Sequence, residues 1–370
     1  MRELVINLGA VVHNLEVMRS RAGGAMVMGV VKANAYGHGM IEIAKTLESA
    51  GVDYIGVADN EEALQLRAAG VTVPVLTWLQ HPEDDFKAAV SNNIDLGLSS
   101  TEQLERVAEA AEFLGMRANV HLKVDTGLGR NGAAQSDWHK VFKLAAQLQA
   151  NEMIDVVGMF THLSTTSEHD DMAQIGKFEA AVGEARDAGL SPRIRHLTAS
   201  DGSLSYPDAH YEMVRVGAAL YGLDPFSAGR AGEWGLRPVM TAKSSVVQVK
   251  RVEAGHGVSY GYLHKTERAT TLALVPVGYA EGLPRDATRH VQVLLNNRLY
   301  PILARIAMDQ FVLDVGDDTV RAGDEVVLFG DPAAGVPSAD DWARACDSIN
   351  YEIVTRMGGR FSRRYLGAAE

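Results

Sequence analysis

Two kinds of segment alternate along the N-terminal part of the chain, up to about residue 225. Short runs rich in β-branched residues are typical of buried strands, and most are separated by stretches with apolar residues at helical spacing. The strand-like runs are 27–34, 54–59, 73–78, 94–100, 119–125, 156–162, 194–200 and 213–222. Eight alternations of strand and helix predict a parallel (β/α)8 barrel, with a doubly wound open sheet as the alternative.

Several of the helical stretches also carry the residues expected at helix ends. Glycine follows the last apolar position in most of them, as is common at helix C-termini. Ser100 precedes a helical pattern that has Glu102 and Gln103 in its first turn, which predicts a helix start. The connection 201–212 is short and interrupted by a proline, so we expect an irregular unit between the last two strands.

The pattern changes after about residue 236. Strand-like runs separated by glycine and polar turns predominate, and helical patterning returns only at 338–354. A chain of 370 residues is longer than one core usually serves, so two domains are expected. We predict a barrel over 1–230 and a mostly β domain over 231–370, with 226–235 as the linker.

Composition narrows the class of protein. A net charge of −12 argues against a nucleic-acid partner or an anionic membrane surface, because no basic excess is present to neutralise phosphates. With Cys346 as its one cysteine, the chain can form no internal disulfide, which favours a reducing compartment. The N-terminus lacks a signal-peptide pattern, and no apolar run reaches membrane-spanning length. We therefore expect a cytoplasmic enzyme, and we predict no metal site.

Charged and polar residues stand where the predicted barrel strands end. Lys32 ends the first strand, Arg130 follows the fifth, and His162 ends the sixth. Ser200 ends the seventh strand and Arg215 lies in the eighth. Each residue alone has an ordinary structural explanation. The carboxyl ends of barrel strands meet at one face, however, so these side chains are expected to converge there.

A lysine at such a face has a specific chemical use. Partial burial and neighbouring cations lower the pKa of a lysine, and a neutral amine can form a Schiff base with a carbonyl compound. One candidate is an aldolase, and the other is an enzyme that uses pyridoxal phosphate. Ser200 and Gly217 stand at the usual phosphate position of a barrel.

Seven motifs then make the second candidate specific. VVKANAYGHG, LKVDTGLGRNG, THLSTT, RVGAALYG, GVSYG, PVGYAEG and AMDQ occur in the same order as in the alanine racemases, the fold-type III pyridoxal-phosphate enzymes. The resemblance covers essentially the whole chain. It implies a homodimer with shared active sites that interconverts L-alanine and D-alanine and supplies D-alanine for peptidoglycan.

The resemblance also implies how the reaction is divided between residues. Lys32 matches the lysine that binds the cofactor and then acts as one base, and Tyr260 matches the second base, donated by the partner subunit. Two opposed bases suit racemisation, because a proton must leave one face of Cα and arrive on the other. His162 matches the histidine that hydrogen-bonds this tyrosine. Arg215 matches the arginine that faces the pyridine nitrogen, which an arginine leaves unprotonated.

Further positions carry over in the same way. By resemblance, Arg130 contacts the substrate carboxylate, and Lys123 stands where the family often has an N-carboxylated lysine. The implied phosphate contacts are Tyr36, Ser200, Gly217 and the backbone of Ala218, and the implied substrate contacts from the partner subunit and the entrance are Met308, Asp309 and Tyr279, with Asp286 beyond them.

Three positions depart from the family pattern, and they keep alternatives open. Ala199 stands where asparagine is common, Ala307 where cysteine is common, and Gly359 where some members have a phosphate-binding tyrosine. A broader racemase that accepts serine or lysine therefore remains an alternative, as does an amino-acid decarboxylase on the same fold. A non-catalytic cofactor-binding barrel is disfavoured because such proteins lack a second domain.

Overall fold

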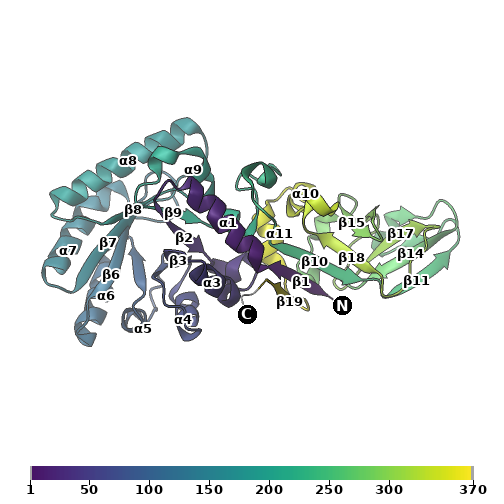
Figure 1. Ribbon diagram of the computed structural model, residues 1–370, viewed down its shortest axis with the longest axis horizontal. Coiled ribbons are helices and arrows are strands. Elements are labelled where there is room, and N and C mark those ends of the chain that lie inside the picture. Colours follow the sequence, from purple (N-terminus) through teal and green to yellow (C-terminus); the bar gives the residue numbers. More distant parts are fainter. Residues whose placement is uncertain (1, 368–370) are drawn as a thin grey trace. The chain divides into compact units, whose positions relative to one another are not determined.

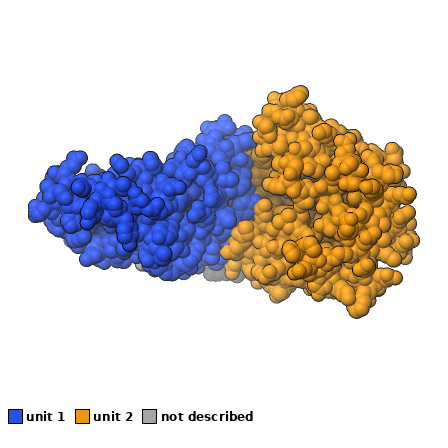
Figure 2. Space-filling view, turned by 180° about the vertical axis from the view of Figure 1, so that it is seen from behind, with its two compact units in different colours: residues 1–14, 36–39, 218–370 blue, residues 15–35, 40–217 orange. Residues whose placement is uncertain are grey.

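The computed structural model describes residues 2–367, which divide into two compact units (Figure 2). The barrel unit comprises residues 15–35 and 40–217. The β unit comprises the described part of residues 1–14, 36–39 and 218–370. Within residues 2–367, no helix combines the length and the apolar character that crossing a bilayer demands.

Eight parallel strands between residues 26 and 216 form the wall of the barrel unit (Figure 1). They are β2 (Met26–Val30), β3 (Tyr54–Val57), β4 (Val75–Thr77), β5 (Asp95–Leu98), β6 (Ala118–Lys123), β7 (Ile154–Phe160), β8 (Ile194–His196) and β9 (Met213–Val216). β2 pairs with both β3 and β9. The backbone N–H of Arg215 donates to the carbonyl of Thr198 at 3.1 Å and closes the ring. The predicted (β/α)8 barrel is therefore confirmed, and the open sheet is wrong.

Helices lie outside these strands (Figure 1). They are α3 (Met40–Ser49), α4 (Asn60–Ala68), α5 (Phe86–Ser91), α6 (Thr101–Leu114), α7 (Trp138–Ala150), α8 (Glu168–Asp187) and the short α9 (Ser200–Ser205). The predicted start of α6 is confirmed, because Ser100 accepts a hydrogen bond from the backbone N–H of Gln103. The irregular unit is also confirmed, since α9 is followed by the 3₁₀ turn Pro207–Ala209. The sequence pattern missed α5 and the N-terminal helix α1 (Leu8–Arg21).

Two larger sheets build the β unit. The first has the order β16-β15-β18-β10-β1-β19, and the second has the order β11-β14-β17. Their strands are β1 (Glu3–Asn7), β10 (Met240–Ser245), β11 (Gln248–Val252), β14 (Thr270–Val275), β15 (Gln292–Leu295), β16 (Arg298–Pro301), β17 (Phe311–Gly316), β18 (Glu325–Phe329) and β19 (Ser362–Leu366), with a small hairpin of β12 (Gly257–Val258) and β13 (His264–Lys265). The first strand of the chain thus pairs with the last.

The helical pattern at 338–354 corresponds to two short helices rather than one. α10 (Ala339–Ala345) is capped by Ser338, which accepts from the backbone N–H of Asp341 at 3.0 Å. α11 (Asn350–Arg356) follows after a break in which Asp347 has a φ of 52°. A non-glycine residue in this left-handed region interrupts a right-handed helix.

Candidate active site

Lys32 leads directly into an unusual turn at the carboxyl end of β2. The helical element α2 (Lys32–Tyr36) contains four consecutive non-glycine residues in the left-handed region, with φ values of 52° to 54° at Ala33, Asn34, Ala35 and Tyr36. Each such residue costs about 1–2 kcal/mol. Local bonds hold the turn, since the Asn34 side chain accepts from the backbone N–H of Met40 at 2.9 Å. Strained backbone of this kind is typical of functional sites.

Lys32 lies among cations on the barrel unit. Its Nζ is 5.9 Å from the centre of the Trp78 ring. Burial, Arg130 and Arg215 lower the pKa of Lys32, against the opposing effect of Glu62. The predicted partly desolvated lysine therefore has the environment that favours its neutral, nucleophilic form.

Lys123, at the end of β6, is a second buried lysine in this cluster. Burial, followed by Arg215 and Arg130, lowers the pKa of Lys123 to about 7. Its Nζ lies 5.3 Å from the centre of the Phe160 ring. At neutral pH a large fraction of the side chain is therefore an uncharged amine, which is the form that reacts with carbon dioxide.

The lowered pKa of Lys123 gives a pH dependence of stability with a definite sign. Between pH 7 and 10 Lys123 binds more protons in the unfolded chain than in the folded chain, so its contribution to the free energy of unfolding rises with pH. Relative to Lys123→Gln, we expect the unmodified protein to gain up to ~1.4 kcal/mol per pH unit across this range. Urea denaturation of both proteins at pH 7 and 9, in buffer free of bicarbonate, measures the change. If the free energy of unfolding changed by the same amount between pH 7 and 9 in both proteins, the lowered pKa of Lys123 would be contradicted.

Arg215 on β9 is the centre of a buried hydrogen-bond network. Its two terminal nitrogens donate to the carbonyls of Thr161, His196 and Leu197 at 2.8–3.0 Å. They also contact Nδ1 of His196 at 3.0 Å and Nδ1 of His162 at 3.1 Å. Burial lowers the pKa of Arg215 to about 10, so the guanidinium stays charged at neutral pH. The Nε–H takes no part in these five bonds.

His162 follows β7 and is held by this guanidinium. Burial and the neighbouring Arg215 keep the pKa of His162 well below its ordinary value, so the imidazole is neutral. Because Nδ1 faces a guanidinium donor, it must accept, and the ring proton is assigned to Nε2. His162 can therefore donate a hydrogen bond outward from Nε2.

Ser200 and Gly217 lie together at the carboxyl ends of β8 and β9. The hydroxyl of Ser200 accepts from the backbone N–H of Gly217 at 3.0 Å. Arg130 is exposed in the loop between Asp125 and Ala133, which the Asp125 N–H closes by donating to the Ala133 carbonyl at 2.9 Å. The ends of β8 and β9 thus carry a hydroxyl and a backbone amide, and the loop after β6 carries a cation. These are groups that bind anions.

Other predicted residues belong to the β unit. Tyr36 is buried, its ring centre lies 4.8 Å from that of Tyr221, and burial raises its pKa. Ala218 begins the 3₁₀ helix Ala218–Tyr221. The phosphate contacts assigned to Tyr36 and Ala218 stay predictions.

Tyr260 projects from a strained loop of the β unit. Its side chain is 74% exposed, and Ser259, Gly261 and Tyr262 beside it all have positive φ values. The hydroxyl of Ser259 donates to the carbonyl of Arg305 at 2.9 Å and anchors the loop. The backbone thus presents Tyr260 to the surrounding solvent.

Met308 and Tyr279 lie on two loops that are tied together. The backbone N–H of Tyr279 donates to the Ala307 carbonyl at 3.1 Å, and that of Ala280 donates to the Met308 carbonyl at 2.9 Å. Met308 is 53% exposed. The predicted neighbours Tyr279 and Met308 are therefore brought together within the β unit.

Two residues to which the sequence analysis assigned no role brace these loops. Arg360 pairs with Asp309 at 2.7 Å and with the fully buried Glu281. Glu281 stands in the PVGYAEG motif, whereas Arg360 lies in a segment without any motif that would indicate a role at the site. The adjacent Gly359 has a φ of 58°, and a Cβ there would lie 2.4 Å from the Ala280 carbonyl. In this backbone the position therefore requires glycine.

Comparisons with known proteins cover the full length of the chain. The family model described as alanine racemase, N-terminal domain, matches residues 6–225, and that for the C-terminal domain matches residues 239–365. The alanine racemase of Frankia casuarinae is 48% identical over 98% of this chain and 95% of its own, and that of Thermobifida fusca is 45% identical over 99% and 98%. The crystal structure of alanine racemase from Streptomyces lavendulae superposes with a TM-score of 0.97 at 42% identity, covering 100% of this chain and 97% of its own.

Proposed function

Because the chain belongs to the alanine racemase family, and is therefore an isomerase that acts on alanine, we propose a two-base reaction that uses pyridoxal phosphate. Lys32 serves as one base, and Tyr260 of the partner subunit serves as the other. The observation that carries the proposal is the convergence of the Lys32 amine with the Arg215–His162 pair at one end of the barrel.

The residues of the barrel unit fit this cofactor. Lys32 has the lowered pKa that covalent attachment needs, and the Nε–H of Arg215 is left over for a ring nitrogen. The hydroxyl of Ser200, whose oxygen accepts from the N–H of Gly217, suits a phosphate group because it can donate its own proton to a phosphate oxygen. When bound, pyridoxal phosphate supplies an electron sink that acidifies the α-proton of the amino acid. Arg215 would weaken this electron sink, because its guanidinium keeps its proton and so leaves the pyridine nitrogen unprotonated.

Protons then move through two side chains on opposite faces of the substrate. The Lys32 amine would remove or return the α-proton on its own face. The phenol of Tyr260 of the partner subunit does so on the other face. A free phenol has a pKa near ~10 and is a weak base. The Nε2–H of His162 stabilises the phenolate by donating to it, and the buried charge of Arg215 adds to this effect.

Arg130 and Lys123 hold the carboxylate of the substrate in this proposal. Arg130 binds the carboxylate directly. The pKa of Lys123 is about 7, so about half of its amine is neutral at pH 7. That amine adds to carbon dioxide and releases a proton, which forms an N-carboxylate. This modification replaces repulsion among Lys123, Arg130 and Arg215 by attraction, and so braces Arg130. Met308 and Asp309 of the partner subunit cover the carboxylate from the other side.

The shared site requires a homodimer. Large exposed apolar side chains mark interaction surfaces, and the β unit exposes Tyr260, Tyr262, Leu263, Tyr279 and Met308. We infer that these residues meet the barrel of a second copy. The proposal also includes a cytoplasmic location and a role in supplying D-alanine for peptidoglycan, as the family resemblance implies.

Substrate range is tested by proton exchange in deuterated water. The protein is mixed with single enantiomers of alanine, serine and lysine. We expect alanine to gain α-deuterium and lose optical activity. Exchange only with serine or lysine would support the broader racemase instead, and release of carbon dioxide would support the decarboxylase.

A further inference from the structure

A row of buried polar side chains continues from Arg215 into the interior of the barrel. His196 on β8 contacts Arg215 through Nδ1, and its Nε2 lies 3.0 Å from Nδ1 of His121 on β6. Nε2 of His121 lies 3.5 Å from Oδ2 of Asp95 on β5. Both histidines are 0% exposed and Asp95 is 3% exposed. Four polar groups buried in one row are costly unless each is satisfied by the next.

The barrel wall is shaped to allow this row. β6 and β8 are separated by β7, so a contact between His121 and His196 must cross the inner face of β7. Gly158 of β7 pairs with His121, and a Cβ there would lie 2.3 Å from Nδ1 of His121. On the other side, Phe160 stacks on His196 with ring centres 4.7 Å apart and planes 7° apart. The two imidazoles are therefore fixed by their surroundings.

The hydrogen bonds of the row run in one direction. The Arg215 guanidinium can only donate, so Nδ1 of His196 must accept. Burial and Arg215 keep the pKa of His196 well below its ordinary value, and the neutral ring carries its proton on Nε2. That proton is donated to Nδ1 of His121, so the proton of His121 itself is on Nε2. Among the described residues this Nε2 makes no hydrogen bond, and the charged group it faces is Oδ2 of Asp95, 3.5 Å away and within ion-pair range. The order is Arg215, His196, His121, Asp95.

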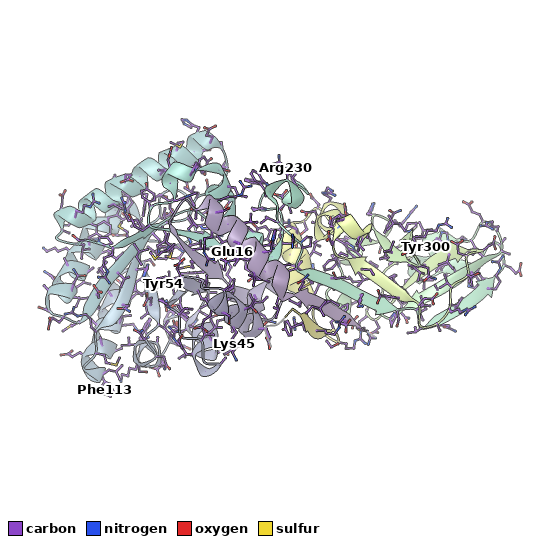
Figure 3. All side chains as sticks on the ribbon, viewed as in Figure 1. Glu16, Lys45, Tyr54, Phe113, Arg230 and Tyr300 are labelled. Carbon is purple, nitrogen blue, oxygen red and sulfur yellow. The ribbon has the colours of Figure 1, made fainter. Side chains whose placement is uncertain are left out.

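Asp95 is held as the acceptor at the far end. Its Oδ1 accepts from the side-chain amide of Asn119 at 2.9 Å, and its Oδ2 accepts from the hydroxyl of Tyr54 at 2.9 Å. Tyr54 is labelled on β3 in Figure 3. Burial alone would raise the pKa of Asp95, but contacts from His121, Asn119 and Tyr54 lower it, so the carboxylate stays ionised. An ionised carboxylate can only accept, and it therefore sets the direction of the whole row.

We propose that Asp95 and His121 are positioning residues for the proposed racemase reaction, because they fix the tautomer of His196 that accepts from Arg215. The inference rests on the proposed role of Arg215 beside the cofactor. It assigns a function to two interior residues that lie outside the group converging at the barrel mouth. Through them, the orientation of the Arg215 guanidinium depends on a carboxylate three side chains away.

Asp95→Asn tests the direction without changing the size of the side chain. Asn119 needs an oxygen opposite its amide, so the new NH2 group must face His121 and Tyr54. An NH2 donor makes Nε2 of His121 an acceptor, moves both ring protons to Nδ1 and turns Nδ1 of His196 toward Arg215 as a donor. The Nδ1–H of His196 and the N–H of Arg215 are then two donors that face each other with no acceptor between them. Tyr54→Phe is the matched control, since it removes one donor to Asp95 and leaves the direction intact.

The experiment compares holoenzymes labelled with ¹⁵N-histidine, with the His121 signals assigned from His121→Gln. Imidazole ¹⁵N shifts distinguish the two tautomers. We expect Nε2–H for both histidines in the unmodified protein and in Tyr54→Phe, and Nδ1–H for both in Asp95→Asn. For Asp95→Asn we also expect an altered cofactor absorbance and a fall of about tenfold in kcat, with little change in KM. Tyr54→Phe is expected to keep its kcat within about twofold of the unmodified value.

Nδ1–H at either histidine of the unmodified protein overturns the inference, even if no variant folds. So does an Asp95→Asn protein that keeps Nε2–H at both rings, or that changes tautomer without any change in absorbance or kcat. Failure of the proposed function is a separate result, because it shows as a lack of α-proton exchange with alanine in the unmodified protein, whatever the tautomers are.

Discussion

Lys32→Ala is expected to yield a folded protein that holds no cofactor covalently and racemises alanine at least ~10⁴-fold more slowly. The reason is that one side chain performs two tasks, attachment of the cofactor and proton transfer on one face. The Lys32 side chain is only partly buried at the start of α2, and contacts to the backbone hold the turn. Truncation of Lys32 should therefore remove the reactive amine with little loss of packing. Borohydride reduction followed by mass spectrometry measures covalent cofactor, and polarimetry measures racemisation.

Lys45→Ala serves as the control for this experiment. Lys45 is an exposed lysine on α3, labelled in Figure 3, and its loss should leave both readouts unchanged. If Lys32→Ala protein still carried one covalently bound cofactor after reduction, the site assignment would be lost.

Tyr260→Phe is expected to reduce racemisation by about 10³-fold while leaving one half of the chemistry intact. The phenol is the proton donor and acceptor on one face only. One enantiomer of alanine should therefore continue to exchange its α-proton with deuterated water, through Lys32, with retention of configuration. The other enantiomer should neither exchange nor racemise. Proton NMR combined with chiral chromatography separates these outcomes.

Tyr262→Phe is the matched control, because Tyr262 stands two residues away in the same exposed loop. Equal loss of exchange for both enantiomers in Tyr260→Phe would contradict the two-base assignment.

Mixing the two inactive variants tests the shared site itself. After subunit exchange between Lys32→Ala and Tyr260→Phe proteins, half the dimers are mixed, and each mixed dimer has one site with both bases intact. Activity should recover to about a quarter of the unmodified value. No recovery would place both bases on one chain.

Much of the barrel was predictable because its signals are local. A parallel barrel buries every strand on both faces, so each strand appears as an apolar run, and each helix appears as a periodic one. α5 escaped notice because it spans only Phe86–Ser91, too few residues to show a period. The pairing of β1 with β19 was also out of reach, since it joins residues more than 350 positions apart and no local pattern encodes it.

Some residues of the site could likewise be predicted from local sequence signals, and others could not. Lys32, His162 and Arg215 were predictable because strand ends converge by geometry once the barrel is recognised. The contact between His121 and His196 was not, because it depends on which inward positions of non-adjacent strands share one layer of the barrel. The left-handed turn after Lys32 could not be predicted for another reason. Glycine in a sequence indicates a possible positive φ, whereas the alanines and asparagine of this turn do not.

The pairing of the two chain ends has a consequence for biosynthesis. β1 lies between β10 and β19, and its parallel register with β19 joins Glu3 to Ser362 and Asn7 to Leu366. A ribosome synthesises residues 3–7 long before residues 362–366, so β1 cannot gain its second neighbour until β19 has been made. All barrel strands, by contrast, are available well before that point. Domains generally complete themselves in order of synthesis, yet β1, which precedes every barrel strand in the sequence, is enclosed on both sides only after all of them have been made.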